Sequence, residues 1–548
     1  MLFERLAMNL SILGLLSLMV GALAAQVTND RLLHTDREPQ NWLTYSGSYS
    51  GQRYSLLNQI TPQNVKNLEL QWVFQARSLE KFEATPLVVD GVMYVVEAPN
   101  HLFALDAKSG RAFWDYDYRP SRDVRLCCGS VNRGVAVLGD TLFMGTVDAR
   151  LIAIDSKTGR PLWKTEVGDP KVGYAITHAP LVVKNKVIVG VAGGEYGIRG
   201  FIAAYDAATG KEAWKFYTIP GPGEPGHESW AGDSWSHGGV PAWITGSYDP
   251  ALNLVYWGTG NPGPDFNGDK REGDNLYSDS AVALDADTGQ LKWHFQFTPH
   301  DEYDYDSVQI PVLVDGNWKG TPRKMLLWAN RNGYFYVLDR ATGKFLTGAP
   351  YAKVNWSTGL DESGRPMRAP NARLTAEGVT IYPNALGATN WYSPSYSPRT
   401  NLFYVSSWQD SRMNMGKVSV EFVPGQNYMG GRSRGGVPPT RHGAENTPTE
   451  DSNYGAVLAI DPNTGQTKWQ FKMTDLTASG VLTTASDLLF AGGREGYFYA
   501  LDARSGAQLW KASLGGSVDA GPIAYRVGDK QYISIAAGHN LFTFALGQ

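Results

Sequence analysis

Cysteine is almost absent from the chain. The 548 residues contain two, and they are adjacent, as Cys127 and Cys128. Neighbouring cysteines cannot join the ends of a long loop. They form either a disulfide that closes a small, strained ring of the kind kept at ligand clamps, or two buried thiols that pack as small hydrophobic groups. From these two residues alone, both readings stay open.

Several chemistries are missing from the sequence. It contains no C-x-x-C-H haem motif, no phosphate-binding loop and no G-x-S-x-G nucleophile elbow, and its nine histidines lack metal-ligand spacing. Basic residues are not in excess, since 49 lysines and arginines face 53 acidic residues, for a net charge of -4. This balance argues against nucleic acid or another polyanion as a partner.

The N-terminal residues have the layout of a secretory signal. Arg5 precedes an apolar run at residues 10–20, and Ala22-Leu23-Ala24 supplies small residues for cleavage. The run is too short to span a bilayer, so we expect residues 1–25 to be cleaved rather than kept as an anchor. No second long apolar run follows, which predicts a mature protein without a membrane span, located in the bacterial periplasm. Export also favours the disulfide, because disulfides persist in oxidising compartments.

One phrase recurs along the chain and organises it. Ala153-Ile-Asp-Ser-Lys-Thr-Gly159 leads to Trp163, and related copies place their glycine at Gly110, Gly210, Gly289, Gly343, Gly465 and Gly506. Six of the seven copies carry a tryptophan four residues after the glycine, and Thr347 replaces it in one. Each copy lies between two strand-like runs, which predicts a hairpin turn. The regular tryptophans indicate packing between neighbouring units rather than catalysis.

The spacing of the repeats predicts the architecture. Successive turn glycines are 49, 51, 79, 54, 122 and 41 residues apart, mostly in the range of propeller blades with inserted loops. The gap of 122 residues must contain a further unit, because residues 396–404 echo residues 248–256. We therefore predict an all-β, eight-bladed β-propeller with tryptophan-docking repeats, as a single domain over residues 26–548. Residues 68–72 are expected to pair with the last blade and close the ring.

Long segments rich in glycine, proline and asparagine interrupt the repeats. They cover residues 218–242, 262–278, 351–375 and 411–453. In a propeller, inserts of this length gather on one face and build or cover a central site. The longest, residues 411–453, is expected either to cover such a site or to meet a partner.

An acidic stretch, His300-Asp-Glu-Tyr-Asp-Tyr-Asp306, places four carboxylates within seven residues. Such a charge run is more often a solvated loop. Here, however, tyrosines alternate with Asp304 and Asp306, and this strand period predicts that both carboxylates point the same way. Two convergent carboxylates are typical ligands of a hard cation.

Across nearly all of its mature region, the chain resembles the pyrroloquinoline-quinone (PQQ)-dependent alcohol dehydrogenases, eight-bladed propellers of the bacterial periplasm. The resemblance rests on the tryptophan repeats and on these motifs: Cys127-Cys128 followed by Asn132-Arg133-Gly134, Gly193-Gly194-Glu195, Gly258-Thr-Gly-Asn261-Pro, Asp304-Tyr-Asp306 and Asn330-Arg331-Asn332-Gly333. Each motif is weak alone, but the combination is highly specific.

The resemblance implies a cofactor site. An oxidised Cys127-Cys128 pair would lie over one face of the quinone, and Trp243 would stack on the other. Trp243 breaks the phase of the repeats, which favours this role over packing. A flat polyanionic quinone also requires arginine donors at its polar edge. The residues expected there are Glu83, Arg133, Thr177, Gly193, Gly194, Arg331 and Asn390.

The resemblance also implies a metal site and a catalytic base. The expected ligands are Glu195, Asn261, Asp304 and Asp306. Asp304 is expected to act as the base as well, with Asp301 as the rival candidate. Calcium-dependent relatives carry an uncharged residue where Asp306 stands, whereas lanthanide-dependent relatives carry aspartate. A lanthanide ion is therefore expected, with calcium as the alternative.

We therefore predict an enzyme that oxidises primary alcohols, with aldehydes as second substrates, by hydride transfer to PQQ. The resemblance implies a soluble cytochrome c as a separate electron acceptor, and it suggests a homodimer. One alternative is a calcium-dependent quinoprotein that acts on another polyol or sugar. The other is a non-enzymatic propeller scaffold, which would have no need of the paired cysteines, Trp243 and Asp304 together.

The adjacent cysteines are expected to be disulfide-bonded in the exported protein. Alkylation without reductant, followed by mass spectrometry, should label neither Cys127 nor Cys128, and labelling should appear only after reduction. Two labelled thiols in active, exported protein without prior reduction would contradict this expectation.

Overall fold

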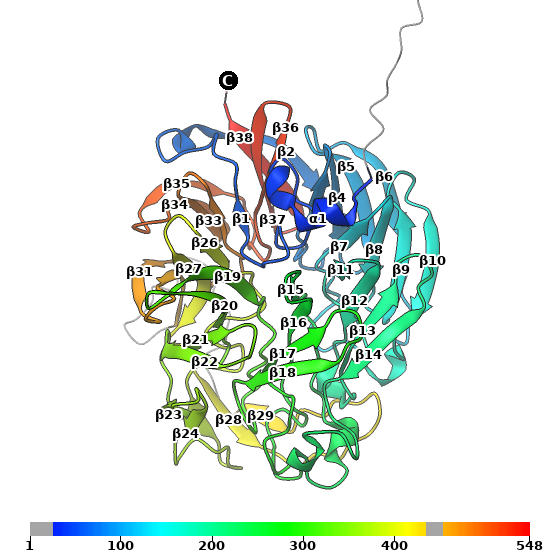
Figure 1. Cartoon of the computed structure of the whole chain (residues 1–548), viewed down its shortest axis with the longest axis vertical. Helices are drawn as coiled ribbons and strands as arrows, with labels where there is room; N and C mark the ends of the chain where they lie inside the picture. Colours follow the sequence, from blue (N-terminus) through cyan, green and yellow to red (C-terminus); the bar gives the residue numbers. More distant parts are fainter. Residues whose placement is uncertain (1–25, 434–452, 548) are drawn as a thin grey trace, which may run out of the picture.

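The computed structural model describes residues 26–433 and 453–547, so the predicted signal segment, residues 1–25, lies outside the described residues. Within the described part, eight sheets of four or five strands stand around a common centre (Figure 1). The all-β class and the propeller are confirmed, and the number of these sheets agrees with eight blades.

The blades are numbered here in chain order. Blade 1 contains β3 (Leu87–Val89), β4 (Val92–Glu97), β5 (His101–Asp106) and β6 (Ala112–Asp117), and blade 2 contains β7 (Val135–Leu138), β8 (Thr141–Gly145), β9 (Arg150–Asp155) and β10 (Pro161–Glu166). Blade 3 contains β11 (Leu181–Val183), β12 (Lys186–Gly190), β13 (Phe201–Asp206) and β14 (Glu212–Tyr217), and blade 4 contains β15 (Ser247–Asp249), β16 (Leu254–Gly258), β17 (Ser280–Asp285) and β18 (Leu291–Gln296).

Blades 5 to 8 follow the same plan. Blade 5 contains β19 (Val312–Trp318), β20 (Thr321–Ala329), β21 (Tyr334–Asp339) and β22 (Phe345–Pro350), and blade 6 contains β26 (Ser395–Ser397), β27 (Leu402–Gln409), β30 (Tyr454–Ile460) and β31 (Thr467–Lys472). Blade 7 contains β32 (Leu482–Thr484), β33 (Leu488–Gly492), β34 (Tyr497–Asp502) and β35 (Gln508–Ser513), joined by β1 (Tyr54–Ser55). Blade 8 contains β36 (Ile523–Val527), β37 (Lys530–Ala537) and β38 (Asn540–Leu546), joined by β2 (Leu68–Gln75).

The inserted segments form smaller elements. Two small sheets contain β23 (Ser357–Leu360) with β24 (Pro366–Arg368), and β25 (Val379–Ile381) with β28 (Met413–Lys417) and β29 (Gly431–Ser433). The helical elements are short: α1 (Asn29–Leu33), η1 (Thr35–Arg37), η2 (Val65–Asn67), η3 (Pro170–Val172), η4 (Gly194–Tyr196), η5 (His227–Ser229) and η6 (Ser234–His237). Among the residues that the structure describes, no helix has the length and apolar character that crossing a bilayer requires.

Burial along the strands explains their composition. All residues of β17 except the last are buried, whereas the outer strand β6 alternates between exposed and partly buried positions. Inner strands are covered on both faces by neighbouring blades, so they read as nearly continuous apolar runs. Outer strands face water on one side and alternate. The hydrophobic core therefore lies between adjacent blades.

The repeated tryptophan docks on the turn of the following blade, as predicted. The indole Nε1 of Trp114 donates to the carbonyl of Ser156 at 3.1 Å, and a Cβ added to Gly159 would lie 2.6 Å from the same ring. Gly159 has a φ of 71°, so the turn requires glycine on both counts. Equivalent bonds join Trp163 to Ala207, Trp214 to Ala286, Trp293 to Arg340 and Trp469 to Ala503.

The ring closes through the N-terminal strand, as expected. β2 pairs with β38 in antiparallel register, from Leu68 opposite Leu546 to Gln75 opposite Asn540. Trp72 of β2 then covers Gly110 of blade 1, where an added Cβ would lie 2.6 Å from its ring. The last blade thus repeats the docking contact on the first, which leaves fewer exposed sheet edges.

The unit predicted inside the longest gap is also present. Residues 395–409 form the β26–β27 hairpin of blade 6, whose turn places Asn401 at a φ of 55°. Asn253 occupies the matching turn of blade 4 at a φ of 54°. In each hairpin a tyrosine hydroxyl, from Tyr396 or Tyr248, donates to the asparagine side chain at 3.1 Å.

Removal of one docking tryptophan is expected to destabilise the ring. Trp214 is buried and bonded to the next blade, so Trp214→Ala should lower stability by about 3 to 5 kcal/mol. Thr347→Ala is the matched control, because threonine already replaces tryptophan at this repeat position. Denaturant unfolding followed by fluorescence and circular dichroism measures both variants. Equal midpoints for the two would contradict the docking role.

Candidate active site

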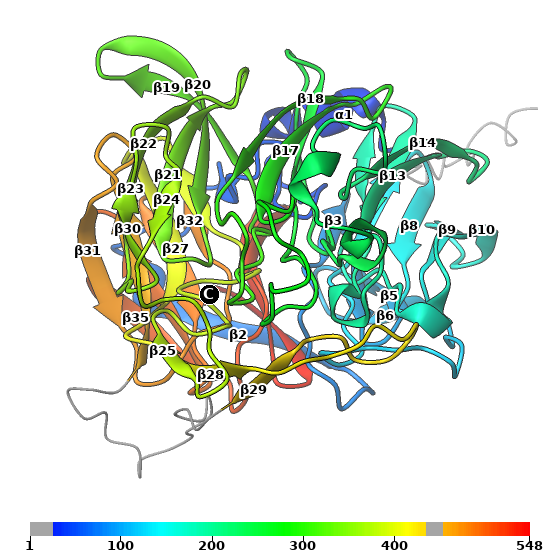
Figure 2. The same ribbon diagram turned by 90° about the horizontal axis from the view of Figure 1, so that it is seen from below.

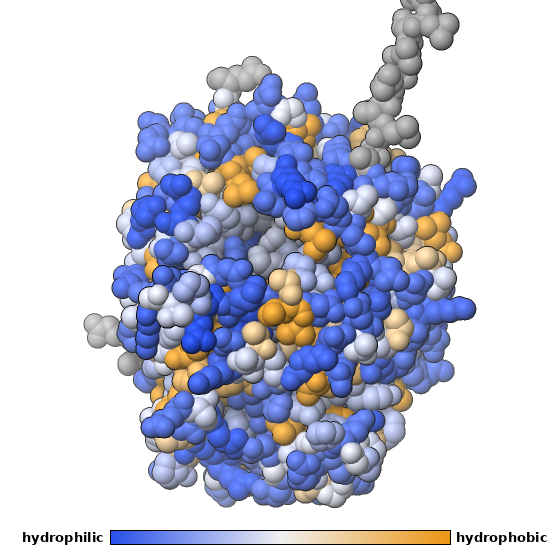
Figure 3. Space-filling view, viewed as in Figure 1, coloured by the Kyte–Doolittle hydropathy of each residue, from blue (hydrophilic) through white to orange (hydrophobic). Residues whose placement is uncertain are grey.

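A large cavity on one face of the disc is not where the predicted site residues lie. On the face that carries α1, a cavity of about 540 Å³ is lined by residues of α1, by Trp42 and Tyr49, and by the start of blade 4 (Figure 3). None of the residues predicted for cofactor or metal binding lines it. The candidate site therefore lies in the loops that carry those residues.

The paired cysteines form a disulfide, which decides between the two readings left open by the sequence. Cys127 and Cys128 are bonded to each other and exposed. The carboxylate Oε1 of Glu195 lies 3.0 Å from Cys127 Sγ. The disulfide and the proposed metal ligand Glu195 therefore border the same space.

Arg133 is held in a buried frame. Its guanidinium Nη2 lies 2.8 Å from Glu83 Oε2, and both side chains are almost inaccessible. Nη1 donates to the carbonyl of Thr177 at 3.3 Å. The guanidinium also lies over the rings of Trp243 and Trp391, 5.2 Å and 4.5 Å from their centroids. Within the described residues, Arg133 Nε has no hydrogen-bond partner, so this guanidinium keeps one N–H donor for a bound molecule.

Trp243 is not one of the docking tryptophans. Its indole Nε1 donates to Asp306 Oδ2 at 3.2 Å, and its carbonyl accepts from Thr177 Oγ1 at 3.3 Å. The side chain is half-buried against an aromatic cluster that includes Trp391 and Trp408. The Trp243 ring thus contacts both the Arg133 guanidinium and Asp306 of the acidic stretch.

Two glycines permit the turn that presents Glu195. Gly193 has a φ of 116°, and an added Cβ there would lie 2.0 Å from the carbonyl of Gly173. A Cβ on Gly194 would lie 2.8 Å from Pro241. Any larger residue would push η4 away, so both glycines serve the placement of Glu195 rather than a direct bond.

The inserted segment 411–433 covers the Glu195 loop. The backbone N–H of Tyr428 donates to the carbonyl of Glu195 at 2.7 Å. Phe422 stacks on His237 with centroids 4.5 Å apart, and the ring of Phe422 also packs against Gly197. Figure 2 shows this segment, in yellow, crossing the face of the disc opposite to α1. The described part of the long insert is therefore a cover, while residues 434–452 lie outside the described residues.

The acidic stretch is not a strand, so the predicted strand period is wrong. Residues 300–306 have no regular secondary structure, and Asp304 has a φ of 65°. The Asp301 carboxylate accepts the backbone N–H groups of Tyr303 and Tyr305, at 3.0 Å and 2.8 Å. These bonds favour an irregular turn over a sheet ladder.

Asp304 and Asp306 nevertheless converge, on Arg331. Its guanidinium lies 3.2 Å from Asp304 Oδ2 and 2.5 Å from Asp306 Oδ2. The second oxygen of Asp306 accepts the backbone N–H of Asn261 at 2.9 Å. Asp304 keeps 20% of its side chain exposed, whereas Asp301 is fully buried. Of the two rival bases, Asp304 is the one a substrate can reach.

The site holds an excess of buried negative charge. Burial, with repulsion from Asp306, raises the pKa of Glu195 to about 7, although Arg331 acts in the opposite direction. Burial also raises the pKa of Asp304 well above its usual range, against the attraction of Arg331 and with repulsion from Asp306. Carboxylates in such surroundings favour a proton or a cation.

The three predicted carboxylate ligands, Glu195, Asp304 and Asp306, do not meet at one point. Among the described residues, the three-residue group with ligand atoms within 4.8 Å of one another is Cys127, Cys128 and Glu195. Asp304 and Asp306 instead bind Arg331, because an ion pair relieves part of their mutual repulsion. Convergence of Asp304 and Asp306 is observed, and convergence of Glu195 with them is not.

Other predicted residues take more local roles. Asn390 is buried, and its side chain donates to the carbonyl of Leu386 and accepts from the N–H of Trp391. Thr177 binds Arg133 through its carbonyl and Trp243 through its hydroxyl. Both residues therefore support the side chains that border the site: Thr177 contacts Arg133 and Trp243, and Asn390 contacts the backbone of Trp391.

Sequence reasoning missed the charged residues behind the site. Asp265 is buried next to Asn261, and burial and the carboxylates of Glu195 and Asp306 raise its pKa well above the usual range. Arg271 is fully buried and donates to the carbonyl of Asp301 at 2.5 Å. Both lie in segment 262–278, and no periodicity or known motif marks them there. Only the location of that insert after Asn261 gave a hint.

Comparison with known proteins gives a consistent assignment. The model of a family described as "PQQ: Glucose/ethanol/alcohol dehydrogenase, beta-propeller domain" matches residues 42–367 and 361–533. The quinoprotein alcohol dehydrogenase PedH of Pseudomonas putida is 38% identical over 550 residues, which cover 95% of this chain and 90% of that protein.

Two further relatives carry a metal in their names. The lanthanide-dependent methanol dehydrogenase of Methylacidiphilum fumariolicum is 37% identical, over 97% of this chain and 90% of that protein. The solved structure titled "Europium-containing methanol dehydrogenase" is 35% identical, with a TM-score of 0.87, and the match covers 94% of this chain and all of that one.

Proposed function

Because the chain belongs to the family of PQQ-dependent alcohol dehydrogenases, we propose that it oxidises small primary alcohols with PQQ and a lanthanide ion bound at the site described above. Aldehydes are proposed as second substrates. The observation that carries the proposal is the convergence of Asp304 and Asp306 on Arg331 beside Trp243.

The residues of the site fit a flat, polyanionic cofactor. Arg133 is held between two indole rings and has an Nε without a partner among the described residues. Arg331 supplies a second buried guanidinium. Trp243 and the Cys127–Cys128 disulfide could each cover one face of a flat ring system. Planar guanidinium groups and aromatic faces suit carboxylates on a fused ring system.

We assign each predicted residue a role toward the quinone. Trp243 and the disulfide would cover its two faces, while Arg133 and Arg331 would bind its acidic edge. Gly193 and Gly194 would act through the placement of Glu195. Polar and supporting contacts are proposed for Glu83, Thr177 and Asn390.

The proposed chemistry depends on Asp304. Its carboxylate would accept the hydroxyl proton of the alcohol, and the carbinol carbon would give up a hydride, so that the alcohol leaves as an aldehyde. When bound, PQQ supplies the hydride acceptor and the cation polarises its carbonyl as a Lewis acid. Arg331 would keep Asp304 oriented, and the aromatic wall of Trp243 would limit the access of water.

Charge counting supports a trivalent ion. Glu195, Asp304 and Asp306 would supply three carboxylates and Asn261 a neutral oxygen. Around a divalent ion this set is over-anionic, whereas a trivalent ion of similar size attracts every ligand more strongly. The named metals of two relatives support the same choice. Calcium, with a polyol or a sugar as substrate, is the second candidate.

We further propose a periplasmic location, a soluble cytochrome c as electron acceptor and a homodimer. The signal-like N-terminus and the exposed disulfide support the location. The absence of a C-x-x-C-H motif supports a separate electron carrier. A purely structural scaffold is disfavoured, because the family description and the names of similar proteins are those of dehydrogenases. The charged central cluster would also only cost stability in a scaffold.

Asp304→Asn is expected to lower dye reduction with PQQ, metal and ethanol by on the order of a hundredfold or more, because the base is lost. Its melting temperature should change little. Asp301→Asn is the matched control, and it should lower the melting temperature because Asp301 holds two backbone N–H groups. An inactive but stable Asp301→Asn together with an active Asp304→Asn would reverse the assignment of the base.

Metal-free protein loaded with PQQ is expected to become active with micromolar lanthanum and to stay nearly inactive with calcium alone. Asp306→Ser should weaken lanthanum activation strongly, because one negative ligand is lost. Asp529→Ser, which removes an exposed carboxylate in the β36–β37 turn, is the control and should behave as wild type. Titration of each metal against dye reduction decides, and equal activation by calcium would favour the calcium-dependent alternative.

A further inference from the structure

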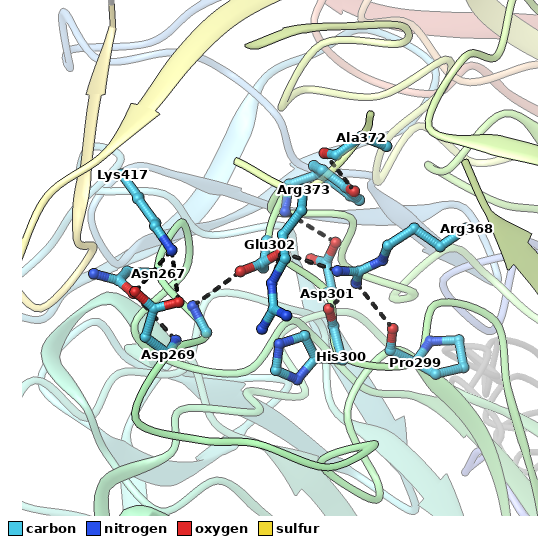
Figure 4. Close-up of polar contacts among 12 residues, drawn as sticks. Asn267, Asp269, Pro299, His300, Asp301, Glu302, Arg368, Ala372, Arg373 and Lys417 are labelled. Atoms are coloured by element: carbon cyan, nitrogen blue, oxygen red, sulfur yellow. Dashed lines mark hydrogen bonds and ion pairs between the residues drawn. The ribbon is translucent and has the colours of Figure 1, made fainter. Parts of the chain in front are cut away.

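A buried ion pair lies directly behind the acidic stretch. The Glu302 side chain is fully inaccessible, and its Oε2 lies 3.0 Å from Nη1 of Arg368, the last residue of β24 (Figure 4). The second carboxylate oxygen accepts the backbone N–H of Gly268 at 3.3 Å. One carboxylate therefore joins three segments that are far apart in the sequence: the insert 262–278, the acidic stretch and the β23–β24 hairpin.

Arg368 also grips the backbone of the acidic stretch. Its Nη2 donates to the carbonyl of His300 and lies 3.5 Å from the carbonyl of Pro299. A guanidinium can serve a carboxylate and backbone carbonyls at once, because its donors lie in a planar fork. The insert 351–375, which contains Arg368, makes a second contact with the acidic stretch, because the hydroxyl of Tyr303 donates to the carbonyl of Ala372 at 2.9 Å.

Among the described residues, Arg368 is the cation closest to the Glu302 carboxylate. Arg373 approaches the same carboxylate only to 3.9 Å and is engaged with Glu272 at 2.9 Å. Arg271 lies on the inner side, where it donates to the carbonyl of Asp301. Arg368 is thus the outer clamp of the stretch, and Figure 4 shows it reaching toward both Glu302 and Pro299.

The clamped backbone is the part that directs Asp304. His300 and Asp304 have φ angles of 50° and 65°, in the left-handed region that residues other than glycine adopt only when their surroundings enforce it. Asp301 fixes the interior of the turn through the N–H groups of Tyr303 and Tyr305. If the clamp loosened, Asp304 and Asp306 would lose their common direction toward Arg331.

We propose that Arg368 is a positioning residue for the metal and substrate site, acting through Glu302 and the His300 carbonyl to fix the direction of Asp304 and Asp306. Its consequence for metal binding rests on the proposed function. Its consequence for the backbone does not.

Truncation of Arg368 is expected to act specifically on the acidic stretch. The side chain lines a surface pocket of about 410 Å³, so Arg368→Met would let water reach a carboxylate that has lost its close cation. A buried charge left without its partner is strongly unfavourable, and the segment that carries it tends to rearrange. Arg365 lines the same pocket on the same hairpin but pairs with Asp274 at the surface. Arg365→Met therefore removes the same charge without removing a direct contact to the stretch, because Asp274 reaches the stretch only through its backbone carbonyl, which accepts the N–H of His300.

The first test uses hydrogen exchange on the full-length protein without metal or PQQ. Arg368→Met is expected to speed exchange of the amides of Tyr303 and Tyr305 at least tenfold, because their bonds to Asp301 depend on the fixed turn. Arg365→Met should leave them at the wild-type rate. Wild-type exchange at these amides in Arg368→Met would overturn the proposal.

The second test uses europium luminescence in the presence of PQQ, which reports affinity and the number of bound waters without turnover. Loss of a residue that orients metal ligands typically costs about 10- to 100-fold in affinity. We expect such a loss, with added bound water, for Arg368→Met, a smaller loss for Arg368→Lys, and none for Arg365→Met. Wild-type affinity and hydration in Arg368→Met would contradict the positioning role even if its melting temperature fell.

The two tests separate this inference from the proposed function. If wild-type protein failed to bind europium, the proposed metal site would be wrong, and the exchange rates of Tyr303 and Tyr305 would still decide whether Arg368 fixes the turn.

Discussion

The burial of several neighbouring carboxylates, which also repel one another, is the constraint on which the structure of the site depends. Asp304 and Asp306 share the guanidinium of Arg331, and Glu195 and Asp265 add charge from neighbouring loops. One arginine at the centre does not neutralise this set, and burial makes the imbalance more costly than it would be in water. The surrounding loops must therefore hold together groups that repel one another, and the site is prepared for further positive charge.

The propeller supplies the rigidity for this. Each docking tryptophan, such as Trp114 on Gly159, joins one blade to the next by both packing and a hydrogen bond, and β2 closes the ring on β38. On this frame the inserts act as outer supports. Tyr428 fixes the loop of Glu195 from one side, and Arg368 fixes the acidic stretch from another. Loops that carry chemistry are thus held by other loops rather than by the blades alone.

The sequence predicted the fold better than the site, for physical reasons. A turn such as Asp155 to Gly159 repeats with its tryptophan, so its chemistry is visible without a structure. The period of Asp304 and Asp306 was misread as a strand, because the bonds of Asp301 to the backbone are tertiary consequences of a turn that no spacing reveals. Asp265, Arg271 and Arg368 were missed because ion pairs between separate inserts leave no periodic signal. The direction of the carboxylates was nevertheless correct.

We propose that the carboxylates around Arg331 form a lanthanide site next to bound PQQ. A crystal structure of the protein with PQQ and lanthanum would test this directly, with diffraction data collected where lanthanum scatters anomalously. We expect a single strong anomalous peak coordinated by Glu195, Asn261, Asp304 and Asp306, with the quinone between Trp243 and the Cys127–Cys128 disulfide. A peak elsewhere, or Asp306 still paired with Arg331 and directed away from the ion, would contradict it.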